Sequence, residues 1–144
     1  MKRARLNELL QTAMMEVFSQ TFGLELQPCE APPAEDGYTA EIPFSDGRES
    51  FSAAVWVQKP ILRRLANLLL FEEDPDEETL RDLTSELANF IVGHAKMAAS
   101  DKNLPYSIET PRFSGIKPLE QSDRTLLYEF ENQCVALQIK GLNG

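Results

Sequence analysis

The order of the predicted secondary-structure elements most constrains how this chain can fold. Apolar spacing predicts, in chain order, a helix over 5–22, strands over 38–44 and 50–58, helices over 61–71 and 75–100, and strands over 105–113, 124–131 and 134–140. Helices and strands do not alternate regularly, which argues against a doubly wound parallel sheet. We expect an α+β fold, a mainly antiparallel sheet with helices packed on it, in a single domain spanning residues 1–144.

Turn and capping residues separate these elements. Residues 45–48 read Ser-Asp-Gly-Arg and predict a hairpin between the first two strands. Residues 28–37 are rich in proline and acidic side chains and predict a loop. The acidic joint over 72–78 leads into the long helix, where Asp74 is expected to cap the helix and Pro75 to take its first position. We interpret this joint as a helix start, because acidic side chains favour the positive end of a helix dipole.

The charge balance narrows the class of partner. The chain carries a formal net charge of −9. A nucleic-acid-binding protein needs Lys and Arg to replace counterions around phosphate, so we expect no nucleic-acid partner and no binding to an anionic membrane. Residues 2–5, Lys-Arg-Ala-Arg, look like the basic start of a signal peptide, but no apolar core follows them, so we expect no secretory signal. No stretch approaches the length of a membrane span, so we expect a cytoplasmic protein.

The cysteine and histidine content gives little support to a metal site. Cys29 and Cys134 are far apart in the sequence and form no CxxC pair, and we expect both to be reduced thiols. With His94 as the only histidine, the chain lacks the four ligands that a structural zinc site requires. We expect no metal site and no cofactor of its own.

The long helix carries the most informative pattern. On a helical wheel, the side expected to face the core collects Leu80, Leu83, Leu87, Phe90, Ile91, His94 and Ala98. The opposite, polar side collects Asp82, Glu86, Asn89, Gly93, Lys96 and Ser100. Glu86 and Asn89 are three residues apart, so a carboxylate and an amide lie side by side on this surface. Glycine inside a helix costs roughly 1 kcal/mol of stability relative to alanine. Close approach of another backbone would explain why Gly93 is present despite this cost.

A polar stripe of this kind is by itself most often the wet face of an amphipathic helix. The pattern alone therefore leaves both interpretations open. His94 falls on the apolar side, where we expect a packed, hydrogen-bonded residue and not a catalytic base. The sequence contains no GxSxG, P-loop, GxGxxG or HExxH motif, so it offers no support for a small-molecule enzyme.

The local sequence around this helix is more specific than its periodicity. Residues 82–96, Asp-Leu-Thr-Ser-Glu-Leu-Ala-Asn-Phe-Ile-Val-Gly-His-Ala-Lys, resemble the signature helix of the CheC/CheX/FliY chemotaxis phosphatase family, with its pattern D/S-x-x-x-E-x-x-N. Residues 108–115 are similar to the strand that follows this helix in the family, and residues 17–23 to the end of the first CheX helix. The element order also agrees over roughly residues 6–140.

The resemblance implies a function and a site. The family's activity implies a phosphatase acting on the aspartyl phosphate of a CheY-type response regulator, which holds the Mg²⁺. Asn89 would orient the attacking water, Glu86 would pair with the regulator's active-site lysine, and Gly93 would allow its loops to approach. Asp82, Lys96 and Ser100 would be contacts at the rim.

The resemblance also indicates the branch of the family. Members with two active helices carry a second ExxN, whereas the first helix here has Glu16 followed by Ser19, so we expect one active pair as in CheX. Resemblance to CheX also implies a homodimer that pairs through sheet edges. The alternative is a non-catalytic CheX-like scaffold, or a regulator-binding module of a two-component or flagellar switch system.

Overall fold

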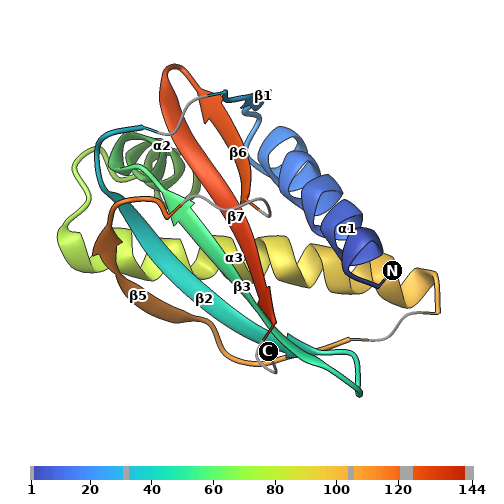
Figure 1. Ribbon diagram of the computed structural model, residues 1–144. Helices are drawn as coiled ribbons and strands as arrows, with labels where there is room; N and C mark the ends of the chain where they lie inside the picture. The colour runs from blue at the N-terminus through green and yellow to red at the C-terminus, as the bar shows by residue number, and fades with distance from the viewer. Residues whose placement is uncertain (1, 31–32, 104–105, 121–124, 142–144) are drawn as a thin grey trace.

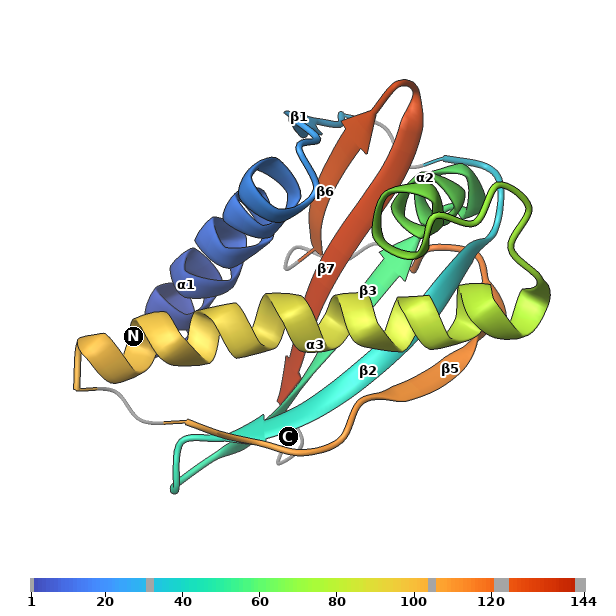
Figure 2. The same ribbon diagram turned by 180° about the vertical axis from the view of Figure 1, so that it is seen from behind.

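A computed structural model of the chain describes residues 2–30, 33–103, 106–120 and 125–141. Its elements in chain order are α1 (Lys2–Glu16), a π-helical turn η1 (Val17–Thr21), β1 (Gln27–Pro28), β2 (Gly37–Ser45), β3 (Ser50–Val57), α2 (Lys59–Leu70), α3 (Glu77–Asp101), β4 (Ser107–Ile108), β5 (Arg112–Lys117), β6 (Thr125–Phe130) and β7 (Gln133–Gly141). Figure 1 shows the sheet in front of the helices, and Figure 2 shows the helices in front of the sheet. The predicted α+β architecture is confirmed.

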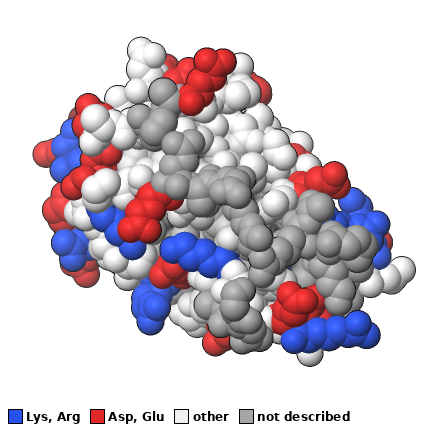
Figure 3. Space-filling model, viewed as in Figure 1, with Lys and Arg blue, Asp and Glu red and all other residues white. Residues whose placement is uncertain are grey.

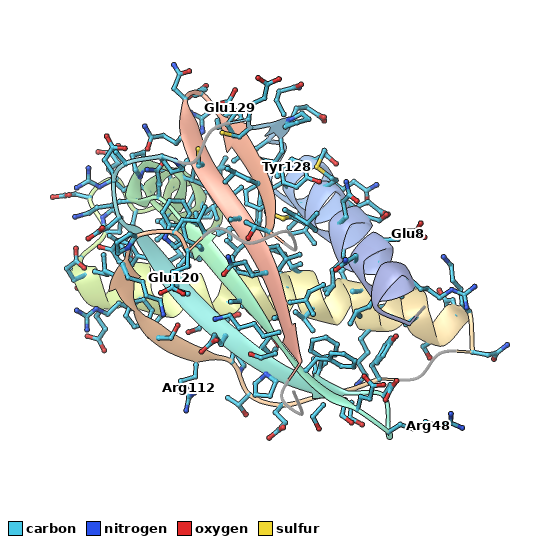
Figure 4. All side chains as sticks on the ribbon, viewed as in Figure 1. Glu8, Arg48, Arg112, Glu120, Tyr128 and Glu129 are labelled. Atoms are coloured by element: carbon cyan, nitrogen blue, oxygen red, sulfur yellow. The ribbon has the colours of Figure 1, made fainter. Side chains whose placement is uncertain are left out.

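The strands form one antiparallel sheet in the order β1-β6-β7-β3-β2-β4, and β5 pairs with β2 on the same side as β4. The β2–β3 pair runs from Tyr38 opposite Val57 to Ser45 opposite Ser50. Its turn is held by Asp46, whose Oδ1 accepts from the backbone N–H of Arg48 at 2.9 Å and of Glu49 at 2.8 Å. The predicted hairpin is therefore confirmed, and Figure 4 labels Arg48 at its tip.

The main core lies between the helices and one face of the sheet. Successive strand residues point to opposite faces, so alternate apolar residues of β2, β3 and β7 meet the helices. Its largest fully buried side chains include Leu10, Met14 and Phe18 near α1, Ile42 and Leu137 on the sheet, and Leu80, Leu87 and Ile91 on α3. A smaller cluster of Trp56, Leu127, Cys134 and Ala136 is separate from this core. In it, Trp56 Nε1 donates to the Lys117 carbonyl at 2.8 Å.

Several predicted boundaries shift in the structure. The expected strand over 105–113 is broken into β4 and β5 around Pro111, which has no N–H to donate to a ladder. The expected loop over 28–37 begins beside β1, a two-residue strand that pairs with β6. The first helix ends as an α-helix at Glu16 and continues as the π-helical turn. β6 and β7 are joined by a turn at Glu131 and Asn132, both with positive φ, so β6 ends and β7 begins one residue earlier than the strands predicted over 124–131 and 134–140.

The start of α3 differs from the prediction. Asp76, two residues after the expected cap Asp74, is the N-cap, and its Oδ1 accepts from the backbone N–H of Thr79 at 2.8 Å. Pro75 precedes the helix and is buried. Asp76 takes an extended conformation that leaves its side chain free to turn back onto the first helical turn, which is the geometry a cap requires. This bond also lowers the pKa of the Asp76 carboxyl.

Candidate functional site

The candidate site lies on the face of α3 that points away from the sheet. The buried residues of α3 are Leu80, Leu83, Thr84, Leu87, Ala88, Ile91, Val92, Ala95 and Ala99. Glu86 and Asn89 are both exposed, and Gly93 one turn further on is partly exposed. In the described part of the chain neither Glu86 nor Asn89 has a hydrogen-bond or ion-pair partner. The pair is thus presented to solvent with its polar atoms unoccupied.

Gly93 leaves open space on this face. A Cβ added to Gly93 would meet no heavy atom within 4 Å. Packing within the chain therefore does not require glycine here, although glycine inside a helix costs about 1 kcal/mol relative to alanine. Asp82, Lys96 and Ser100 are also exposed on α3, so the structure brings the predicted polar residues to one surface.

Two exposed apolar side chains belong to the same surface, and one of them corrects the sequence analysis. Phe90 was expected in the core, but 40% of its surface is exposed, and Met97 is 71% exposed. Glu86, Phe90, Gly93 and Met97 follow i, i+4, i+7, i+11 spacing, so they form one row along the helix. This spacing is the signal that identifies Phe90 as part of the surface.

Phe90 is held in place by Phe22, which follows the π-helical turn η1. Its ring lies 6.0 Å from that of Phe22 in an edge-to-face arrangement, and Phe22 meets buried Phe18 in the same way at 5.4 Å. The Phe90 ring therefore packs on one side and faces solvent on the other. The sequence interpretation placed Phe90 inside because Leu87 and Ile91 lie close to it on the wheel, whereas the position of α1 sets the actual edge of the buried arc.

The start of α3 is anchored to the sheet and to α2. The Tyr38 hydroxyl donates to the Glu77 carboxylate at 2.7 and 2.8 Å, and Lys59 Nζ lies 3.1 Å from Glu77 Oε1. Burial and the neighbouring Glu77 raise the pKa of Tyr38 to about 12. The hydrogen bond from Tyr38, followed by that from Lys59, lowers the pKa of Glu77. These contacts hold the helix in a defined position ahead of the Glu86–Asn89 pair.

The position on α1 that resembles a second pair is engaged elsewhere. Glu16 Oε2 lies 3.2 Å from His94 Nε2, and the Ser19 hydroxyl donates to the Glu16 carbonyl at 3.5 Å. Ser19 also belongs to the π-helical turn, which changes its spacing from Glu16 relative to an α-helix. His94 is thus a partly buried, hydrogen-bonded boundary residue that ties α1 to α3.

The two cysteines meet in space, which the sequence did not indicate. They form no disulfide with each other, and their Sγ atoms are 3.6 Å apart. Burial, together with the hydrogen bond to Cys29, raises the pKa of the Cys134 thiol to about 12. This pair lies in the small cluster with Trp56, on a different part of the fold from the α3 surface.

The surface of the described chain carries charges of both signs. Figure 3 shows acidic and basic side chains interspersed on the sheet side of the molecule, without a continuous basic patch among the side chains drawn there. Within the described ranges, no helix is both long and apolar enough to cross a bilayer. The same residues contain no group of three or more His, Cys, Asp or Glu arranged to hold a metal ion.

Comparison with known families identifies the family to which the chain belongs. The family model for the chemotaxis phosphatase CheX matches residues 38–131, more than half of the chain. The chain belongs to the CheX family. No curated protein matches it. The matched range contains α3 and the Glu86–Asn89 pair, together with most of the sheet.

Solved structures show the same fold at low sequence identity. The chain is similar to CheX from Vibrio vulnificus with a TM-score of 0.78, 16% identity and coverage of 95% of this chain and 99% of that one. A CheC-like superfamily protein from Shewanella sp. PV-4 gives a TM-score of 0.73, 21% identity, and coverage of 94% and 96%. The CheX–CheY–BeF₃–Mg²⁺ complex from Borrelia burgdorferi gives a TM-score of 0.64, 16% identity, and coverage of 93% and 96%.

Proposed function

We propose that this CheX-family protein hydrolyses the aspartyl phosphate of a CheY-type response regulator. The observation that carries the proposal is the exposed Glu86–Asn89 pair on α3, whose polar atoms have no partner in the described chain. The similar Borrelia burgdorferi protein was crystallised with CheY, BeF₃ and Mg²⁺, which supports a regulator of this class as partner. The proposal places Mg²⁺ on the regulator.

Asn89 acts by positioning water. In hydrolysis the water oxygen bonds to phosphorus while the bond from phosphorus to the aspartyl oxygen breaks, leaving inorganic phosphate and a free carboxylate. Phosphoryl transfer depends mainly on alignment and charge stabilisation, because little covalent chemistry is left for the protein. An amide offers both a donor and an acceptor and does not titrate, so Asn89 can orient water in line with the phosphorus.

Glu86 and the rest of the row hold the docked regulator. The Glu86 carboxylate pairs with the regulator's active-site lysine and fixes the position of Asn89 beside the phosphate. Gly93, which has open space beyond its Cα, admits the regulator's backbone. Phe90 and Met97 supply apolar contact on either side of Gly93, and Asp82 and Lys96 contribute polar contacts at the rim.

Phosphate release from a phosphorylated regulator tests this function. The regulator is phosphorylated with a small-molecule donor, and phosphate loss is followed with wild type, Asn89→Ala, Glu86→Ala and, as a matched asparagine control on α1, Asn7→Ala. We expect Asn89→Ala to slow stimulated release by about a hundredfold, the cost of losing alignment, while it still binds the BeF₃-activated regulator. Glu86→Ala weakens both binding and release, and Asn7→Ala behaves as wild type.

The same experiment decides between hydrolysis and scaffolding. The exposed apolar residues Phe90 and Met97 favour binding of a protein partner whether or not hydrolysis follows. Binding of the activated regulator without faster phosphate loss would replace the phosphatase proposal with the scaffold. Full activity of Asn89→Ala would show that the water is positioned by another group. We propose a cytoplasmic location because response regulators of this class act there.

A further inference from the structure

Two cysteines that are remote in the sequence meet on the sheet face that the proposed function does not use. Cys29 follows β1 and Cys134 lies near the start of β7, and their Sγ atoms are 3.6 Å apart. Ala136, in the same small cluster as Cys134, alternates along β7 with the core residues Val135 and Leu137. The thiol pair therefore lies on the face opposite α3, and the inference drawn from it does not rest on the phosphatase proposal.

The two thiols differ in their access to solvent. Cys134 is 5% exposed, whereas Cys29 is partly exposed. Burial, followed by the hydrogen bond to Cys29, raises the pKa of the Cys134 thiol to about 12, so this thiol keeps its proton at neutral pH. Because the thiolate is the nucleophile in disulfide exchange, an oxidant dissolved in water reacts first with Cys29. Cys134 is then the group already placed beside the modified sulfur.

The backbone holds Cys134 more firmly than Cys29. The backbone N–H of Cys134 donates to Gln58 Oε1 at 2.7 Å, and the Cys134 carbonyl accepts from the backbone N–H of Gln58 at 3.1 Å. Cys29 lies one residue beyond the two-residue strand β1, where its N–H donates to the Leu127 carbonyl at 3.1 Å. Cys134 is thus a fixed point, and Cys29 belongs to a short segment at the margin of the sheet.

A bond between the two sulfurs requires a limited movement. The S–S distance in a disulfide is about 2.05 Å, so the sulfurs have to approach by about 1.5 Å. β6 lies between β1 and β7 in the sheet, and β1 is at its edge. Figure 1 shows β1 beside the end of the β6–β7 hairpin. The approach is therefore made by the segment around Cys29, which has a strand neighbour on one side only.

We propose that Cys29 and Cys134 are a redox-sensitive pair that a small-molecule disulfide, such as glutathione disulfide, converts to a reversible internal disulfide. The Cys29 thiolate attacks one sulfur of the oxidant, whose S–S bond breaks, which leaves a mixed disulfide on Cys29 and releases one thiol. Cys134 then gives up its proton and attacks the Cys29 sulfur, and the second thiol leaves. The protein loses two electrons and two protons, and the oxidant becomes two thiols.

The competing interpretation is that the pair only fills space, because a buried cysteine behaves as a small apolar side chain. The partial exposure of Cys29 argues for reactivity, since a purely packing role does not need a thiol within reach of solvent. In a cytoplasmic protein, a disulfide of this kind is usually transient and senses the redox state. The pair is accordingly a modification site and not a permanent part of the fold.

The disulfide should also change the stability of the protein. It joins positions 105 residues apart and so encloses β2, β3, α2 and α3 in one covalent loop. Closing a long loop restricts the unfolded chain more than the folded one. We expect the Tm of the oxidised protein to exceed that of the reduced protein by about 5–10 °C, and dithiothreitol to reverse the change.

Mass spectrometry after treatment with glutathione disulfide tests the proposal. Wild type should lose two hydrogen atoms in mass, run as a monomer on a non-reducing gel and yield a peptide that links Cys29 to Cys134. Cys134→Ala should instead retain one glutathione on Cys29, because the second step is blocked. Cys29→Ala is the matched control and should stay unmodified over the same time, since the remaining thiol is buried.

Two further measurements keep the test independent of how well the variants fold. Wild type quenched at early times should carry glutathione on Cys29, and the Tm of the double variant C29A/C134A should not respond to the oxidant. Wild type that stays unmodified, that accumulates glutathione on Cys29 without forming the internal bond, or that cross-links only between copies would overturn the proposal. Reaction of Cys29→Ala as fast as wild type would overturn the order of the two steps.

Discussion

Replacing Gly93 by alanine should stabilise the protein and weaken its interaction with the regulator. Gly93 lies inside α3, and an added Cβ would meet no atom of the chain within 4 Å, so the methyl group introduces no clash. Alanine is favoured over glycine inside a helix by about 1 kcal/mol. Unfolding entropy near 2.1 cal/mol/K per residue gives about 0.3 kcal/mol/K for a chain of this length, so the Tm should rise by about 3 °C.

The same methyl group points to where the regulator's backbone is proposed to lie. Inserting a methyl group into a well-packed contact costs roughly 1–3 kcal/mol. Such a loss corresponds to a roughly 5- to 150-fold increase in the Kd for the BeF₃-activated regulator. Calorimetric or circular-dichroism melting measures the first effect, and titration with the activated regulator measures the second.

A matched control separates stabilisation from the effect on docking. Thr12→Ala, on the exposed face of α1, also replaces a weaker helix former by alanine and should raise the Tm without altering the Kd. Destabilisation by Gly93→Ala would refute the view that this position is open. Stabilisation with unchanged regulator binding would refute the argument that glycine is needed there for close approach.

Two further predictions concern what holds α3 in place. Tyr38 and Lys59 lower the folded-state pKa of Glu77, so the contribution of Glu77 to stability is present above its ordinary pKa of about 4.3 and is lost as the pH falls through the lower folded value. In Glu77→Gln, the unfolding free energy measured by urea titration should therefore fall less steeply as the pH is lowered. An unchanged dependence on pH would contradict this argument. Leu87→Ala, at a fully buried position beneath the pair, should lower the unfolding free energy by about 2–5 kcal/mol, and a loss below 1 kcal/mol would indicate that the core beneath α3 collapses around the smaller side chain.

The elements that local pattern specifies agree with the sequence analysis. The helix over 61–71 corresponds to α2, the strands over 38–44 and 50–58 to β2 and β3, and the strand over 134–140 to β7. Their apolar periods of about 3.6 and 2 residues follow from backbone geometry and need no knowledge of the neighbours. The exposure of Glu86 and Asn89 was also predictable, because a residue opposite the centre of an apolar stripe faces solvent whatever packs on that stripe. Their roles in binding and hydrolysis stay predictions.

Features at the margins of these patterns depended on tertiary packing. Phe90 lies at the edge of the buried arc of α3, so its exposure is decided by where η1 places Phe22. Figure 4 labels Tyr128 on β6, whose hydroxyl accepts from Gln11 Nε2 at 2.8 Å and helps to fix α1 against the sheet. The spacing of residues within one element carries no information about such distant neighbours.

The sequence by itself determined the helical and strand periods of the apolar residues, and it placed a carboxylate and an amide three residues apart on one helix. Only the tertiary structure decided that His94 meets Glu16, that Cys29 meets Cys134, and that Phe71 remains almost fully exposed. The reason is physical. Helical and strand periods arise from bonds and dihedral angles within a few residues, whereas each of these outcomes is set by where elements remote in the sequence come to lie in the fold.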